Sequence, residues 1–492
     1  MTPVVATTSP RDLLSRQTTL YVYVALLFVA LALDASVYVG SLFHVYTHDV
    51  AALAAGILGV LRARGDRSLL PNRLVWAPLA LLMFLLANTL LIGALQYSNV
   101  PADMTKLFWF EHGNALRIVG ELLVWVWTLG HLAPTREDAT MLLDIALWGA
   151  TASVAFVEAF WLVTGSSHVG TTTFDLNVMV GLPMAIMFVM ARGRREDLVR
   201  LAIFGAASLL LYSRTSIIVA VFTSLMMLVV VRRPRAVRDS LACVIVGWLL
   251  VFGVSTLSSA IATTLRNGAS PTPIPAGLAA SASPTALASP STAPAFAFGQ
   301  PALDYTVSQP KNPGGGQPAI ERTTSFVSTE LAPYTIPSRL AIWSDAIRIF
   351  EISPIVGVGY HNYFLHSRVT EIKDASRFDI PGLFSSLIKQ AHSDFLSWLA
   401  ETGVVGFALY LGFWGLVLMH GWRRWRAEPW ALERNTFTLA FMVGLLGVST
   451  FGEILVPRTP DWTSSAILWW IVIGLLFIDR APREELERRA KH

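Results

Sequence analysis

Residues 75–95 read VWAPLALLMFLLANTLLIGAL, and residues 241–265 read LACVIVGWLLVFGVSTLSSAIATTL. Neither stretch contains a charged residue. As an α-helix, each is long enough to cross a hydrocarbon core of roughly 30 Å. These stretches predict membrane-spanning helices rather than the buried helices of a soluble protein.

The composition of the whole chain agrees with this prediction. Of 492 residues, 54% are hydrophobic and 14% are charged, whereas about a quarter of a typical soluble domain is charged. The net charge is +4, but the arginines form short clusters between apolar runs. That pattern indicates membrane topology and not a nucleic-acid partner. The single cysteine, Cys243, excludes an intrachain disulfide and a cysteine-based metal site.

The apolar runs predict an all-α, polytopic integral membrane protein with about twelve transmembrane helices. No cleavable signal peptide is expected, since residues 1–17 are polar. The predicted spans cover residues 19–40, 46–61, 75–95, 114–133, 140–164, 176–191, 201–213, 215–231, 241–259, 404–420, 436–451 and 463–478.

Basic residues set the expected orientation. If the N-terminus is cytoplasmic, the arginines at 62–67, 192–195, 232–235 and 423–426 all fall on the cytoplasmic side, as does the basic tail. We therefore expect an inner-membrane protein with both termini cytoplasmic.

This orientation divides the chain into four expected parts. They are an N-terminal bundle of about nine helices at 1–258, a large periplasmic loop at 259–403, C-terminal transmembrane helices at 404–480 and a cytoplasmic tail at 481–492.

The loop has two parts that differ in composition. Residues 267–318 are rich in Pro, Ala, Ser and Gly, which predicts disorder. Residues 335–403 should be ordered, with Ser338 capping one short helix and a second helix running from Ser393 until Gly403 ends it.

His392 is the first candidate for chemistry. At the start of a short helix outside the membrane, a neutral imidazole can act as a general base toward a hydroxyl. A solvated helix-capping histidine is the alternative. Glu401, nine residues later, has a structural interpretation that we favour over a direct role in the reaction.

Two arginines lie at or within apolar runs. Arg214 lies at an expected outer junction, where a guanidinium is commonly retained for a phosphate, a carboxylate or water; a snorkelling turn residue is the alternative. Arg117 and Glu121 are four residues apart on one helix face, so a structural buried pair is the favoured interpretation.

Arg339 lies in the first turn of the predicted loop helix. A cation there opposes the helix dipole, so helix stability does not explain it. A bound phosphate would explain a cation at this position, although a solvated surface arginine is the alternative. Gly357 and Gly359 follow that helix and predict a tight turn.

Several motifs are absent from the sequence. It has no Walker A motif, HExxH, GxSxG or cysteine pair. Asp34 and Asp49 are scattered carboxylates rather than the acidic pair that a metal-dependent oligosaccharyltransferase would need in an early outer loop. The sequence therefore favours a reaction without metal or other cofactor.

Three segments in this order resemble the O-antigen ligase and polymerase superfamily. They are YSRTS at Tyr212–Ser216, RLAIW at Arg339–Trp343 with the following SPIVGVGYHNYF, and AHSDFLSWLAETGVVG at Ala391–Gly406. The segment FDLNVMVGLP, which contains Asn177, is similar to the family's asparagine-bearing span.

The resemblance implies an enzyme that transfers a glycan from an undecaprenyl-diphosphate carrier at the periplasmic face without nucleotide or metal. It also implies that His392 is the catalytic histidine and that Arg214 and Arg339 bind the diphosphate. Asn177, Arg117 and Glu401 are further candidates for substrate contact.

The acceptor stays open at this stage. A ligase would use lipid A-core, a polymerase would use a second carrier-linked glycan, and a protein O-oligosaccharyltransferase would use a Ser or Thr side chain. A transporter or flippase for a lipid-linked sugar is the alternative of a different class. In that case Arg214 and Arg117 would line a pathway.

Overall fold

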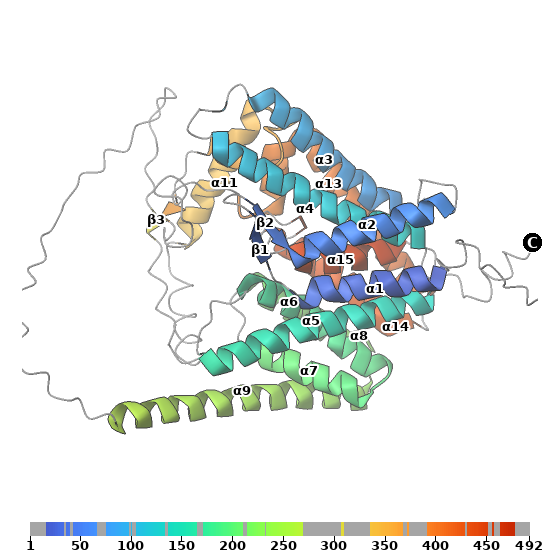
Figure 1. Ribbon diagram of the computed structural model, residues 1–492, viewed down its shortest axis with the longest axis vertical. Helices are drawn as coiled ribbons and strands as arrows, with labels where there is room; N and C mark the ends of the chain where they lie inside the picture. The colour runs from blue at the N-terminus through green and yellow to red at the C-terminus, as the bar shows by residue number, and fades with distance from the viewer. Residues whose placement is uncertain are drawn as a thin grey trace, which may run out of the picture.

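The computed structural model describes residues 16–33, 36–39, 43–65, 75–97, 100, 105–132, 136–164, 171–209, 214–231, 233–268, 307–308, 335–367, 371–372, 391–428, 431–450, 455–456 and 463–477. Long helices dominate these residues and pack side by side in one bundle (Figure 1). The predicted all-α class is confirmed.

Nine helices and a small hairpin begin before residue 259 in the described part of the chain, and the ninth helix continues into the predicted loop. They are α1 (Arg16–Ala32), β1 (Ser36–Val39), β2 (Phe43–Tyr46), α2 (Thr47–Gly65), α3 (Trp76–Gln96), α4 (Thr105–Leu132), α5 (Arg136–Thr164), α6 (Thr171–Ala191), α7 (Arg195–Ser208), α8 (Arg214–Val231) and α9 (Pro234–Gly268).

The remaining elements form the described part of the loop and the C-terminal helices. They are β3 (Val307–Ser308), α11 (Thr335–Ile352), α12 (Tyr363–His366), β4 (Glu371–Ile372), α13 (Asp394–Ala427), α14 (Leu432–Val448) and α15 (Thr463–Phe477). β1 and β2 pair antiparallel, while β3 and β4 form a short parallel pair.

Four helices among the described residues contain segments long and apolar enough to cross a membrane, at Phe108–Leu132, Asp138–Ala159, Phe174–Ala191 and Asp394–Ala427. Shorter apolar helices occur at Gln17–Ala32, Trp76–Ile92, Ser216–Val231 and Ser465–Phe477. These features are those of a membrane protein, whereas the count of twelve spans and the side on which the loop lies stay predictions.

Two helix boundaries differ from the sequence-based prediction. The span predicted at 19–40 ends as a helix at Ala32, because the alternating SVYV at Ser36–Val39 pairs with β2. β-branched and aromatic residues favour such strands. Ser338 is not a cap, since α11 already begins at Thr335.

The predicted stop at Gly403 is confirmed. This residue has φ +64° and ψ −168°, so α13 consists of two helices joined at a kink. Most of the tract 267–318, for which disorder was predicted, lies outside the described residues.

The buried side chains form two cores. The larger core runs through the bundle, from α1 to α15. The smaller one joins α11, α12 and the start of α13, and its members are Ile342, Ala346, Ile349, Val358, Tyr363, Ala391 and Ala400. The second core fixes the segment that carries the predicted histidine.

Candidate active site

His392 directly precedes α13 and has a backbone conformation that few residues other than glycine adopt. Its φ angle is +52°, in the left-handed region. Residues held in such sparsely populated regions cost about 1–3 kcal/mol and persist only where the surrounding structure fixes them. Strain of this kind clusters at functional sites, and His392 is half-buried there.

Hydrogen bonds on both sides of His392 hold this conformation. The amide of Ala391 donates to Oγ of Ser397 at 3.2 Å. The amide of Asp394 donates to the carbonyl of Ser449, just after α14, at 2.8 Å. His392 therefore lies between two fixed points, one within α13 and one at the end of α14.

Arg339 lies on α11, which packs against α13. Ile342, about one turn after Arg339, shares the smaller core with Ala391. Since Ala391 is the residue before His392, the two predicted site residues belong to one packed unit. Arg339 is half-buried in this unit.

Arg214 is the first residue of α8, although its side chain lies outside the described part of the structure. α8 and α14 are antiparallel neighbours: Arg233, just after α8, forms an ion pair with Glu433 in the first turn of α14. Farther along, a Cβ on Gly444 would meet Val219 at 3.2 Å. The Arg214 end of α8 therefore lies beside the Ser449 end of α14, which binds the segment after His392.

Glu401, on α13 nine residues after His392, makes structural hydrogen bonds. Its side chain is fully buried, and the carboxylate accepts a hydrogen bond from the amide of Tyr363 at 3.0 Å. Its carbonyl accepts from the amide of Gly359 at 2.8 Å. These bonds favour the structural interpretation of Glu401 over contact with a substrate.

The turn predicted at Gly357 and Gly359 is confirmed, with φ angles of +73° and +100°. It brings the chain against the backbone of α13, because a Cβ on Gly357 would lie 2.2 Å from the carbonyl carbon of Glu401. The amide of Tyr360 also donates to Oδ1 of Asn88 on α3 at 2.8 Å.

A buried histidine in this turn escaped the sequence-based prediction. His361 has φ +68° and lies 3.9 Å from Glu111 of α4, measured from Nδ1 to Oε2. The signal available in the sequence was a polar residue two positions after Gly359. The sequence contains no comparable signal for Glu111, because this residue lies far from the motifs that resemble the family.

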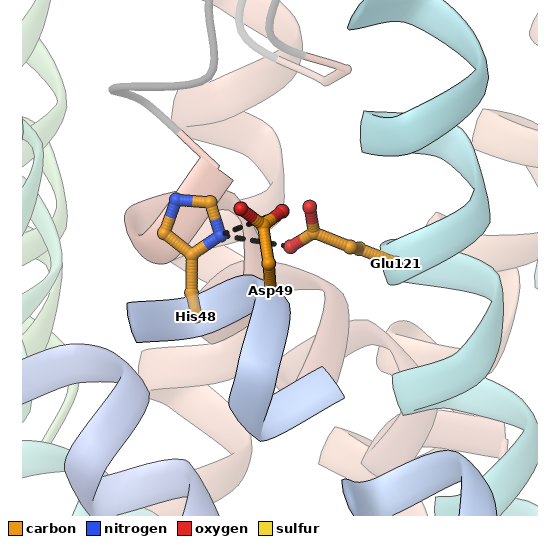
Figure 2. Close-up of side chains that lie close together, drawn as sticks. All are labelled: His48, Asp49 and Glu121. Carbon is orange, nitrogen blue, oxygen red and sulfur yellow. Dashed lines mark hydrogen bonds and ion pairs between the residues drawn. The ribbon is translucent and has the colours of Figure 1, made fainter. Parts of the chain in front are cut away.

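Arg117 belongs to a different polar cluster, between α2 and α4. Figure 2 shows three other members of this cluster, His48, Asp49 and Glu121. Nε of Arg117 lies 3.7 Å from Oε1 of Glu121, as the predicted pair requires, and 3.3 Å from Oδ1 of Asp49. Nδ1 of His48 lies 2.8 Å from Oε2 of Glu121. The pair predicted on α4 is thus part of a four-residue network.

Three members of this network have metal-ligand chemistry. His48, Asp49 and Glu121 offer ligand atoms within 4.8 Å of one another. Arg117 already pairs with both carboxylates, however, and so offsets part of their charge without an ion. An ion-pair network accounts for the arrangement.

Asn177 joins three helices. It is fully buried in α6, where its Nδ2 donates to Oγ of Ser153 on α5 at 3.2 Å. Its Oδ1 accepts from Oγ of Ser465 on α15 at 3.2 Å. These bonds indicate that Asn177 stabilises helix packing.

Residues 199–411 match the family model for O-antigen ligases. This match supports a relationship of the region to the O-antigen ligase superfamily. The resemblance inferred from the motifs is confirmed, and the match contains His392, Arg214, Arg339 and Glu401, while Asn177 and Arg117 precede it. The comparison with curated proteins found no match.

The similarity of this region to O-antigen ligases supports glycan transfer as the activity. Together with the apolar helices, it indicates a bacterial inner-membrane protein with a lipid-linked glycan and an acceptor as partners.

Proposed function

We propose that the protein transfers a glycan from an undecaprenyl-diphosphate carrier to an acceptor hydroxyl at the periplasmic face of the inner membrane. The family match supports the reaction class. The site assignment depends on the hydrogen bond from the amide of Asp394 to the carbonyl of Ser449. This bond joins the segment of His392 to the end of α14, which packs beside α8, the helix that begins with Arg214.

In this proposal, His392 takes the proton of the acceptor hydroxyl as its oxygen attacks the anomeric carbon. The bond from that carbon to the diphosphate oxygen breaks, and the carrier leaves as undecaprenyl diphosphate. Arg214 and Arg339 stabilise the charge that develops on the leaving group. A single displacement inverts the anomeric centre and forms no glycosyl-enzyme intermediate.

The half-buried position of His392 supports this role. Because hydrogen bonds fix the segments on both sides of this base, reorganisation costs little free energy when the acceptor binds. The proposal requires neither metal nor nucleotide, because the diphosphate is already a good leaving group.

The direct test is reconstitution of the purified protein with carrier-linked glycan and acceptor in the presence of a chelator. We expect a glycosylated product and free undecaprenyl diphosphate in equal amounts. His392→Ala should bind the donor without turnover, whereas His420→Ala, a substitution in the distal part of α13, should retain activity. Absence of both products with the unaltered protein would favour a transporter.

The same reaction distinguishes the acceptors. A single addition to lipid A-core indicates a ligase, and a ladder of lengthening glycans indicates a polymerase. Glycosylation of a Ser- or Thr-containing peptide indicates a protein O-oligosaccharyltransferase. We favour a ligase-like transfer, with the polymerase and protein-directed reactions as alternatives within the family.

A further inference from the structure

A cavity of about 910 Å³ lies between α2 and α4, and His392 is not among the residues that line it. Most of its lining is apolar, and Leu53 and Ile57 on α2 leave 68% and 56% of their surface exposed. In a protein of this composition, such a surface faces hydrocarbon chains and not water. The cavity is large enough for a lipid.

Glycines shape the cavity. Gly56 allows α2 to approach α4, since a Cβ there would lie 3.2 Å from Val124. Gly120 on α4 also lines the cavity, but no atom lies within 4 Å of the position of its missing Cβ. A side chain at Gly120 would therefore project into open space.

The cavity has a polar end and a long apolar extension. Asp49, Arg117 and Glu121 line it, and Asp49 and Arg117 retain 18% and 24% exposed side-chain surface. Arg64 lines it fifteen residues farther along α2, at a rise that corresponds to about 22 Å. This length exceeds the roughly 15 Å of one hydrocarbon leaflet.

We infer that this groove binds phosphatidylethanolamine, with the headgroup at Asp49, Arg117 and Glu121 and one acyl chain along α2. The guanidinium of Arg117 matches the lipid phosphate, and the two carboxylates match its ammonium group. A zwitterion therefore finds opposite charges for both of its ionic groups.

Charge also argues against the other lipids. The two carboxylates outnumber Arg117 and repel a diphosphate, which carries several negative charges. An anionic phospholipid without an amine, such as phosphatidylglycerol, would satisfy Arg117 and leave both carboxylates beside its phosphate.

Native mass spectrometry of the full-length protein tests this inference. The protein is released from vesicles that contain equal amounts of phosphatidylethanolamine and phosphatidylglycerol with identical acyl chains. We expect at least fivefold more of the ethanolamine lipid bound. Gly120→Leu, which fills the groove, should reduce its occupancy at least fivefold.

Gly415→Leu is the matched control, because Gly415 on α13 also has no atom within 4 Å of its missing Cβ and does not line the groove. It should retain the lipid. Arg117→Gln should weaken lipid retention and reduce the preference over phosphatidylglycerol. Four outcomes would each overturn the inference. They are equal retention of both lipids, preferential binding of added undecaprenyl diphosphate, a dimer mass that Gly120→Leu abolishes, and unchanged lipid occupancy in Gly120→Leu.

Discussion

The carboxylate of Glu401 accepts a hydrogen bond from the backbone amide of Tyr363, 38 residues earlier in the chain, at 3.0 Å. Both residues are fully buried. The bond attaches the first residue of α12 to the first half of α13, nine residues after His392. The geometry of the proposed site therefore depends on a contact that itself takes no part in the reaction.

Removal of this acceptor should destabilise the protein. Glu401→Ala leaves the amide of Tyr363 buried without its partner, which costs about 1–3 kcal/mol. Glu401→Gln keeps a carbonyl oxygen at the same place and should lose less. Thermal unfolding in detergent measures both changes, and equal losses in the two variants would contradict the importance of the acceptor oxygen.

Substitution of Gly357 should have a comparable or larger effect. Gly357→Ala places a Cβ 2.2 Å from the backbone of Glu401 at a φ of +73°. The left-handed backbone costs about 1–2 kcal/mol, and overpacking adds about 1–3 kcal/mol. Gly415→Ala, where no atom lies within 4 Å, is the control. If both variants unfold at the wild-type temperature, the close approach at Gly357 is not a constraint.

Long helices could be predicted from the sequence because lipid requires long apolar runs. The span predicted at 75–95 corresponds to α3 at Trp76–Gln96. The hairpin was missed, since Asp34 is the only charge between the apolar run of α1 and the apolar residues of β1. Periodicity in so short a segment does not separate a strand from a helix end.

Side-chain contacts also divide into those that the sequence predicts and those that it does not. The pair of Arg117 with Glu121 joins residues four apart on one helix, and the sequence predicts it. The stop at Gly403 was also predictable, because glycine is the residue type that commonly ends a helix. The contacts of Glu121 with His48 and of Glu401 with Tyr363 require packing between distant segments. A single sequence contains no local signal for such contacts.

Neutralisation of Arg339 should impair turnover without loss of protein. Arg339→Gln removes a charged donor proposed for the leaving diphosphate, worth about 1.5–3 kcal/mol, or roughly 10–100-fold in kcat/KM. Arg339→Lys should retain part of the activity, since it keeps the charge and loses the planar fork.

The assay is initial-rate release of undecaprenyl diphosphate, normalised to the amount of protein in the membrane. Arg423→Gln, an exposed arginine near the other end of α13, is the control and should be unchanged. If activity and abundance of Arg339→Gln fall together, Arg339 has a structural role instead. The same comparison applies to Arg214→Gln.

Acid should destabilise the unit formed by α11, α12 and the start of α13. Burial lowers the pKa of His366 below its ordinary value of 6.5, and Arg348 lowers it further, while Asp345 and Glu401 act in the opposite direction. Below about pH 6.5, the unfolded chain therefore binds a proton that the folded chain does not bind. The free energy of unfolding falls as the pH decreases through this window, until the folded form is also protonated.

His366→Gln removes this titration, so its unfolding temperature should depend less on pH than that of the wild type. Unfolding of both proteins between about pH 8 and pH 5 measures the difference, in which the other histidines cancel. We expect the two curves to run parallel above about pH 7 and to converge or cross below about pH 6.5, because only the wild type loses this contribution. Curves that stay parallel over the whole range would show that His366 has the same pKa in the folded and unfolded chain.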